Sequence, residues 1–276
     1  MHHTTDRPEE LTLHEVADEL GVHYMTAYRY VRLGMLEATK RGRSWVVTRE
    51  DLGRFLEAPT EPSERGTAPW DERLLNRMLA PDDAGAWRVI EAALSSGVSA
   101  PDIYMDVITP ALREVGTKWA NGEIDVAQEH AASQIARRVV ARLSPQMSRR
   151  GVRRGTVVVG STATEMHDLP VSIVADLLRS RHFDVVDLGG NLPPESFASA
   201  VRSANNLVAA AIGVTALGQE DEIGRTVAAI RAASDVPILI GGAGVTNEVA
   251  RSLGADAVAT TGADAIEAIE HLTTRT

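Results

Sequence analysis

The sequence predicts a multidomain protein of α and α/β type: a winged helix-turn-helix, a four-helix bundle cap and a doubly wound, five-stranded parallel sheet. Residues 156–276 alternate short apolar runs with amphipathic stretches, which is typical of parallel strands joined by helices. Residues 73–148 carry apolar side chains at helical spacing. The preceding stretch is rich in Pro, Ser, Thr and Glu, which indicates a linker. We therefore place the segments at 1–58, 59–72 (the linker), 73–148 and 149–276.

Composition excludes several classes of function. The 276 residues contain no cysteine, so disulfides, thiolate metal ligands and cysteine nucleophiles are excluded. No apolar run approaches the ~18 residues of a membrane span, and the first residues, MHHTTDRPEEL, lack the order of a signal peptide. We therefore expect a cytoplasmic protein with no membrane partner. Because the net charge is −10, contact with nucleic acid requires a local basic patch.

The first block predicts two short helices joined by a glycine turn, then a basic turn between two strands. Leu13, Val16 and Leu20 mark one helix face, and Gly21 ends that helix. The pattern resembles winged excisionase-type or MerR-like DNA-binding domains. We expect the second helix to contact base edges of double-stranded DNA and the basic turn to contact phosphates: His23, Tyr24, Thr26 and Arg29 in the helix, and Lys40, Arg41 and Arg43 in the turn. The alternative is a small protein-binding domain with a solvated basic loop.

The second block predicts three to four helices with short connections, which indicates a bundle. Asp125 is an expected N-cap. By themselves, Trp119, Glu129 and His130 are ambiguous. A single Trp is usually part of a core, and an adjacent Glu–His pair on a helix is usually a solvated edge.

Five apolar runs in the last block predict strands at 156–160, 184–188, 208–214, 236–240 and 257–260. Helices are expected at about 170–181, 194–204, 219–232, 246–253 and 262–272. Such sheets bind ligands outside the carboxyl ends of their strands, where the strand order reverses. His167 follows the first strand, residues 215–217 follow the third and residues 241–244 follow the fourth. We therefore expect a ligand site at this edge.

The residues at this edge resemble the motif of cobalamin-binding domains. This chain has Glu165-x-His167-x-x-Pro170, then Thr215-x-Leu217, then Gly241-Gly242. The family pattern is Asp-x-His-x-x-Gly, Ser-x-Leu and Gly-Gly. The helical block resembles the cap of that family, with a Trp separated by nine residues from a Glu-His pair. With the helix-turn-helix included, nearly the whole chain resembles cobalamin-dependent photoreceptor repressors of the CarH/LitR class.

The resemblance implies the roles of the site residues. His167 would be an axial ligand of cobalt, and Glu165 would hold the other imidazole nitrogen. The dimethylbenzimidazole tail would lie beside Thr215 and Leu217, where two glycines would let the backbone approach it. The resemblance implies adenosylcobalamin as cofactor, held by Trp119, Glu129, His130, Glu165, His167, Asp168, Thr215, Leu217, Gly241 and Gly242.

The sequence departs from the family at four positions. Glu165 replaces Asp and reaches one methylene further, whereas Thr215 keeps the hydroxyl of Ser. Pro170 replaces Gly, which is acceptable in the first turn of a helix. In the best-described photoreceptors a histidine follows the Trp and coordinates cobalt after photolysis, whereas this chain has Ala120.

These observations together predict a transcriptional regulator without enzyme activity, which senses cobalamin and responds to light through the Co–C bond. Its partners would be a double-stranded DNA operator, cobalamin and further copies of itself, as a dimer or tetramer. Three alternatives remain open: a light-insensitive cobalamin sensor, a photoreceptor with an additional chromophore such as a bilin, and a corrinoid carrier for a methyltransferase. A carrier has no use for a DNA-binding block.

Overall fold

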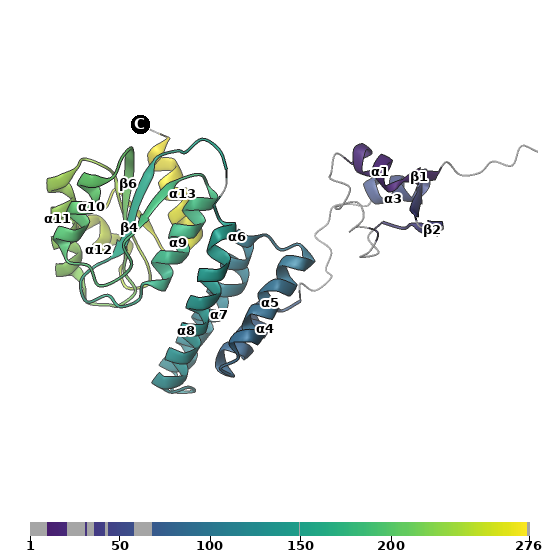
Figure 1. Cartoon of the computed structure of the whole chain (residues 1–276). Helices are drawn as coiled ribbons and strands as arrows, with labels where there is room; N and C mark the ends of the chain where they lie inside the picture. Colours follow the sequence, from purple (N-terminus) through teal and green to yellow (C-terminus); the bar gives the residue numbers. More distant parts are fainter. Residues whose placement is uncertain are drawn as a thin grey trace, which may run out of the picture. The chain divides into compact units, whose positions relative to one another are not determined.

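The computed structural model describes residues 10–20, 31, 36–41, 44–57, 68–148 and 150–274. The chain divides into two compact units, Met1–Thr67 and Ala68–Thr276 (Figure 1). Most of the expected DNA contacts, namely His23, Tyr24, Thr26, Arg29 and Arg43, lie outside the described residues. Of this set, the structure describes Lys40 and Arg41.

The first unit holds a three-stranded antiparallel sheet of order β1-β3-β2. The sequence did not indicate β1, a three-residue strand that precedes α1. A small apolar core, which includes Val16, Leu36, Val47 and Leu52, joins the helices to the sheet. The elements are β1 (Glu10–Thr12), α1 (Leu13–Glu19), β2 (Thr39–Arg41), β3 (Ser44–Thr48) and α3 (Arg49–Glu57).

The helical region begins at Trp70, inside the stretch expected to be linker. Asp125 caps α8 through a capping box with Gln128, and Gly97 ends α5 in the left-handed conformation. A π-helical segment, η1, interrupts the third long helix, which the sequence did not indicate. The elements are α4 (Trp70–Leu79), α5 (Asp83–Ser96), α6 (Ala100–Asp102), η1 (Ile103–Ile108), α7 (Thr109–Ala120), α8 (Val126–Leu143) and the 3-10 turn η2 (Ser144–Gln146).

The last region is a five-stranded sheet of order β5-β4-β6-β7-β8, in which every neighbouring pair is parallel. This confirms the predicted parallel sheet. The strands are β4 (Thr156–Ser161), β5 (Asp184–Asp187), β6 (Leu207–Gly213), β7 (Ile238–Gly241) and β8 (Ala257–Ala259). The helices are α9 (Leu169–Ser180), α10 (Pro194–Ser203), α11 (Glu220–Ala233), α12 (Asn247–Ser252) and α13 (Gly262–Thr273).

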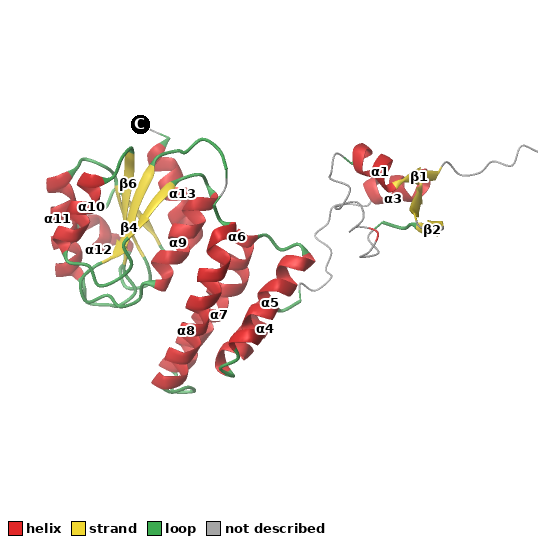
Figure 2. Cartoon of the chain, viewed as in Figure 1, coloured by secondary structure: helices red, strands yellow, loops and turns green. Residues whose placement is uncertain are grey.

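Helices cover both faces of this sheet (Figure 2). Alternate residues of β4 enter two different cores: Val157 and Val159 pack with α9, α13 and the helical region, whereas Val158 packs with α10, α11 and α12. The helical region therefore shares its core with one face of the sheet. None of the described helices has both the length and the apolar character needed to cross a membrane.

A buried polar cluster also joins the helical region to α9. The carboxylate of Asp176 accepts hydrogen bonds from Tyr104 at 2.6 Å, Ser144 at 2.8 Å and Arg179 at 2.7 Å. Tyr104 lies in η1, and burial together with the bond to Asp176 raises the pKa of its hydroxyl well above the usual value. A fully partnered carboxylate at this place fixes one end of the helical region to the sheet.

The strand order reverses beside β4, whose successors along the chain, β5 and β6, lie on opposite sides of it. Chain segments that leave the carboxyl ends of β4 and β6 therefore diverge, and sheets of this kind bind ligands at such a position. Of the residues predicted to bind a ligand, Glu165, His167 and Asp168 follow β4, Thr215 and Leu217 follow β6, and Gly241 and Gly242 lie at the end of β7.

Candidate functional site

The loop between β4 and α9 is built around the carboxylate of Glu165, which is completely buried. Its Oε2 accepts the backbone N–H groups of Thr215 at 2.6 Å and Ala216 at 2.7 Å, just after β6. Its Oε1 accepts the backbone N–H of His167 at 2.9 Å and lies 2.6 Å from the Nδ1 of the same residue. One side chain thus connects the carboxyl ends of β4 and β6, the two strands between which the strand order reverses.

The electrostatics of Glu165 set the tautomer of His167. Burial by itself would raise the pKa of the carboxyl, but the N–H groups of Ala216, His167 and Thr215 and the imidazole outweigh it, so the pKa is lowered. An ionised carboxylate favours a proton on the adjacent Nδ1. The lone pair of Nε2 is then left free to bind a metal ion, and the imidazole is largely exposed.

Asn191 holds the same loop from the β5 side. The Asn191 side chain accepts the backbone N–H of Thr164 at 2.9 Å, and its backbone N–H donates to the carbonyl of Glu165 at 2.8 Å. Thr164 and Asn191 have φ values of 70° and 55°. Asn adopts this conformation more readily than Thr, a β-branched residue for which it is strained. Sequence reasoning missed Asn191; the GGN turn after the second strand was the available signal.

The glycines after β7 are required by the chain's own backbone. A Cβ on Gly242, whose φ is 127°, would lie 2.0 Å from the carbonyl oxygen of Val214, and one on Gly241 would lie 2.7 Å from that of Ala259. Another segment of backbone therefore lies close to both glycines. In the structure that segment is the end of a neighbouring strand and not a ligand. Contact of these glycines with a ligand remains an expectation from the family resemblance.

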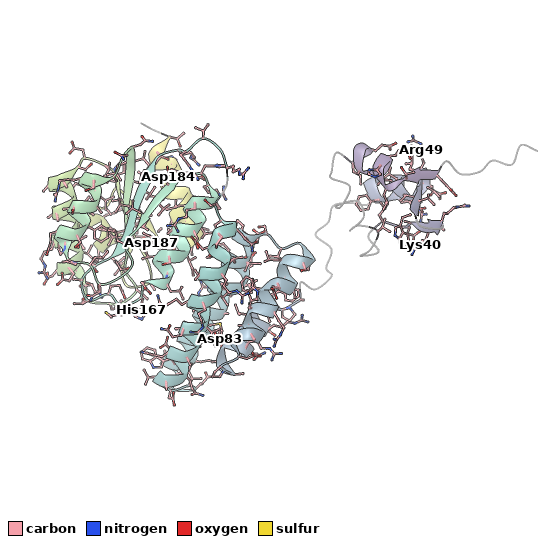
Figure 3. The ribbon with its side chains drawn as sticks, in the orientation of Figure 1. Lys40, Arg49, Asp83, His167, Asp184 and Asp187 are labelled. Carbon is pink, nitrogen blue, oxygen red and sulfur yellow. The ribbon has the colours of Figure 1, made fainter. Side chains whose placement is uncertain are left out.

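Apolar side chains stand exposed around His167. Met166, directly before it, is 69% exposed, and Leu217, which follows the N–H groups that bind Glu165, is 83% exposed. Figure 3 labels His167 at the rim of the sheet region. Apolar surface beside a free imidazole nitrogen suits a large, partly apolar metal complex.

At the far end of the helical region, the structure places the three ambiguous residues near the ends of α7 and α8. Trp119 is 52% exposed, which is unlike a core Trp. Glu129 accepts the hydroxyl of Ser133 at 2.6 Å, and its other oxygen lies 2.6 Å from Nδ1 of His130. Ala120, the last residue of α7, offers no donor atom.

Asp168, directly after His167, forms an ion pair with Arg137 of α8, with 2.7 Å between Oδ2 and Nη1. The guanidinium lowers the pKa of the Asp168 carboxyl. Sequence reasoning named Asp168 but not Arg137. The available sequence signal for Arg137 was its spacing: it follows Ser133 by four residues and Glu129 by eight, which places all three on the same helix face.

The donor set around His167 fits a metal that brings most of its own ligands. Among the described residues there is no group of three or more His, Cys, Asp or Glu side chains able to hold a metal ion. A single imidazole with a free Nε2 offers one coordination position. A cobalt corrinoid would need only that from the protein, because the macrocycle would supply most of the metal's other ligands.

Comparison with known families agrees with this fit. Residues 70–144 and residues 155–270 each match a family model described as a B12 binding domain. Residues 10–59 match a model described as a helix-turn-helix domain. Together the matches support a cobalamin-binding protein that carries an N-terminal helix-turn-helix domain.

The named relatives are corrinoid proteins. A trimethylamine corrinoid protein of Methanosarcina barkeri is 28% identical over 194 residues, covering 68% of this chain and 89% of its own length. Monomethylamine corrinoid protein 1 of Methanosarcina mazei is 25% identical over 203 residues, covering 70% and 93%. The solved structure of a Methanosarcina barkeri monomethylamine corrinoid protein superposes with a TM-score of 0.63 at 23% identity, covering 73% of this chain and 97% of that one, which shows a shared fold. None of these three is named as a photoreceptor.

Proposed function

We propose that this cobalamin-binding protein with a helix-turn-helix domain holds its cofactor at the carboxyl edge of the sheet through His167. The observation that carries the proposal is the pair formed by Glu165 and His167 where the strand order reverses. The buried carboxylate orients the imidazole and keeps its proton on Nδ1. Residues proposed to complete the cofactor site are Trp119, Glu129, His130, Asp168, Thr215, Leu217, Gly241 and Gly242.

Each group of residues would do a separate task. Nε2 of His167 would bind the metal from one side, and the nucleotide tail would lie beside Thr215 and Leu217. Trp119 and Glu129 would cover the opposite side and exclude water. When bound, adenosylcobalamin supplies a Co–C bond that light cleaves.

Two functions follow from cobalamin binding, and different observations favour them. The relatives favour a corrinoid carrier for a methyltransferase, because they are named as corrinoid proteins and match about two thirds of this chain. The helix-turn-helix match at residues 10–59 favours a transcriptional regulator. The comparisons thus give the carrier more support. The regulator is our first proposal because it alone uses the first unit.

The light response rests on the family resemblance alone. That resemblance predicts a cytoplasmic homo-oligomer, either a dimer or a tetramer. With intact adenosylcobalamin the oligomer would bind an operator, and after illumination its oligomeric state would change. A light-insensitive sensor and a protein with an additional bilin remain its alternatives. An absorption spectrum of the loaded protein before and after green light separates them, because a bilin absorbs by itself and a light-insensitive form does not change.

Cobalamin binding is tested with the full chain and adenosylcobalamin. We expect the wild type to retain the cofactor with the absorption spectrum of imidazole ligation, and His167→Ala to lose that ligation. His271→Ala is a matched control, because His271 lies exposed in the last turn of α13. Equal affinity and spectra in the wild type and His167→Ala would contradict the proposal.

Regulator and carrier are distinguished by two measurements on the same preparation. A regulator enriches a specific duplex from a random DNA pool. A carrier instead accumulates a methyl group on its corrinoid when a corrinoid methyltransferase and its methylated amine are supplied. Enrichment of no sequence, together with methyl accumulation, would establish the carrier.

A further inference from the structure

One face of α8 carries a line of polar side chains toward the His167 loop. Glu129, Ser133 and Arg137 follow one another at four-residue spacing, so they lie on one side of the helix. Eight residues of α-helix rise about 12 Å. The line therefore reaches from the residues proposed to cover the cofactor to the ion pair between Arg137 and Asp168.

That ion pair is a polar link between α8 and the loop that carries His167. The rest of the loop is held by sheet residues: Thr215 and Ala216 bind the Glu165 carboxylate, and Asn191 binds its carbonyl. Asp168 follows His167 directly and is the N-cap residue of α9. Its position therefore fixes the end of the loop from which the imidazole projects.

The Asp168 carboxylate depends strongly on Arg137. Its Oδ2 accepts the guanidinium at 2.7 Å, whereas its Oδ1 is buried and has no hydrogen-bond partner among the described residues. Loss of the guanidinium would leave a partly buried carboxylate without a charge partner, which favours movement of the loop toward water.

We propose that Arg137 is a positioning residue for the His167 ligand, which it orients by holding Asp168 against α8. The inference rests on the proposed binding of cobalamin by His167. It adds a role for the helical region: besides covering the cofactor, that region sets the place of the ligand on the sheet. A movement of α8 would then change the position of the His167 imidazole.

The test compares Arg137→Ala with Arg138→Ala, its matched control. Arg138 is the next residue, is about half-exposed and, among the described residues, pairs with Asp83 at the start of α5, at 2.5 Å. We expect Arg137→Ala to bind adenosylcobalamin roughly three- to tenfold more weakly. It should also show a smaller imidazole-ligated fraction at saturation. Amide hydrogen exchange at residues 164–168 of the cofactor-free protein should be faster. Arg138→Ala should match the wild type in all three measurements.

Further variants separate positioning from general destabilisation. Asp168→Asn should reproduce the Arg137→Ala effects, and the double variant should bind adenosylcobalamin no more weakly than either single variant. Arg137→Lys should restore part of the affinity. If Arg137→Ala does not fold, Asp168→Asn tests the same contact. A wild type that binds no adenosylcobalamin overturns the proposed function and this inference with it. A His-ligated wild type with identical behaviour of the Arg137→Ala and Arg138→Ala variants overturns this inference alone.

Discussion

Oε1 of Glu165 lies 2.6 Å from Nδ1 of His167, while Oε2 of the same carboxylate accepts two backbone N–H groups that follow β6. The side chain that orients the imidazole thus also connects the ends of β4 and β6 through hydrogen bonds. We expect its substitution to affect both the stability of the fold and the proposed metal ligation, because one buried group would serve both.

Replacement of Glu165 by Gln tests this double role. An amide has one acceptor oxygen, so its NH2 group must face N–H groups that the carboxylate accepted. We expect a loss of about 1–3 kcal/mol in unfolding free energy and about tenfold weaker cobalamin binding, measured by urea denaturation and titration. Glu267→Gln, an exposed control on α13, should change neither quantity. A Glu165→Gln protein as stable as the wild type would contradict the prediction.

The lowered pKa of Glu165 predicts a pH dependence of stability. In the folded protein this pKa lies below the ordinary value of 4.5. The carboxylate therefore contributes fully above about pH 4.5, and its contribution is lost as pH falls through the folded pKa. The difference in unfolding free energy between wild type and Glu165→Gln should be constant near neutral pH and shrink in acid. A difference that grows in acid would reverse the sign and refute the assignment.

The strand positions and the location of His167 after the first strand were predictable from sequence because each depends on local patterns. The Val157–Val159 run forms a strand buried on both faces, and position after such strands places His167 at the carboxyl edge. The GGN turn and the helix-face spacing mark Asn191 and Arg137, but the partners of these residues were not predictable, because they lie 27 and 31 residues away along the chain. The π-helical segment was also not predicted; it lies directly before Thr109 and Pro110, and a proline indicates a helix irregularity but not its type.

Substitution of Gly242 tests whether the close packing of backbone segments after β7 contributes to the stability of the fold. An Ala Cβ would lie 2.0 Å from the Val214 carbonyl oxygen and would have to adopt a φ of 127°. We expect Gly242→Ala to lose several kcal/mol of stability, roughly 3 or more. Gly218→Ala shares a positive φ, of 75°, but meets nothing within 4 Å, so it should lose only about 1 kcal/mol. Similar melting temperatures for the two variants would show that the crowding at Gly242 relaxes easily.

The buried cluster around Asp176 predicts a graded series of stability losses. Asp176→Ala removes the carboxylate to which Tyr104, Ser144 and Arg179 all donate, which should cost about 3–5 kcal/mol. Tyr104→Phe removes one hydroxyl and should cost about 1–2 kcal/mol. Chemical denaturation measures both. Asp176→Ala should therefore lose more stability than Tyr104→Phe. The reverse order would indicate that the Asp176 carboxylate remains hydrated in the folded protein.

DNA binding, if the first unit performs it, should show the electrostatics of Lys40 and Arg41 on β2. Arg41 is paired with Glu10 at 2.5 Å, and the Lys40 ammonium lies 6.0 Å from the Trp45 ring. Contacts with phosphates carry no sequence information. Lys40→Ala should therefore weaken binding about equally on every duplex. It should also reduce the slope of log affinity against log salt by about 0.9 for each phosphate that the lysine neutralises.

Arg41 gives the sharper measurement, because Glu10 competes with phosphate for its guanidinium. Glu10→Gln removes the competitor and should strengthen DNA binding, whereas Arg41→Ala should weaken it. In the double variant the Glu10 effect should largely disappear. Arg225→Ala, which removes one positive charge paired with Glu222 on α11, controls for net charge and should leave affinity unchanged. Equal weakening by Arg225→Ala and Arg41→Ala would mean that overall charge, and not the basic turn, governs the interaction.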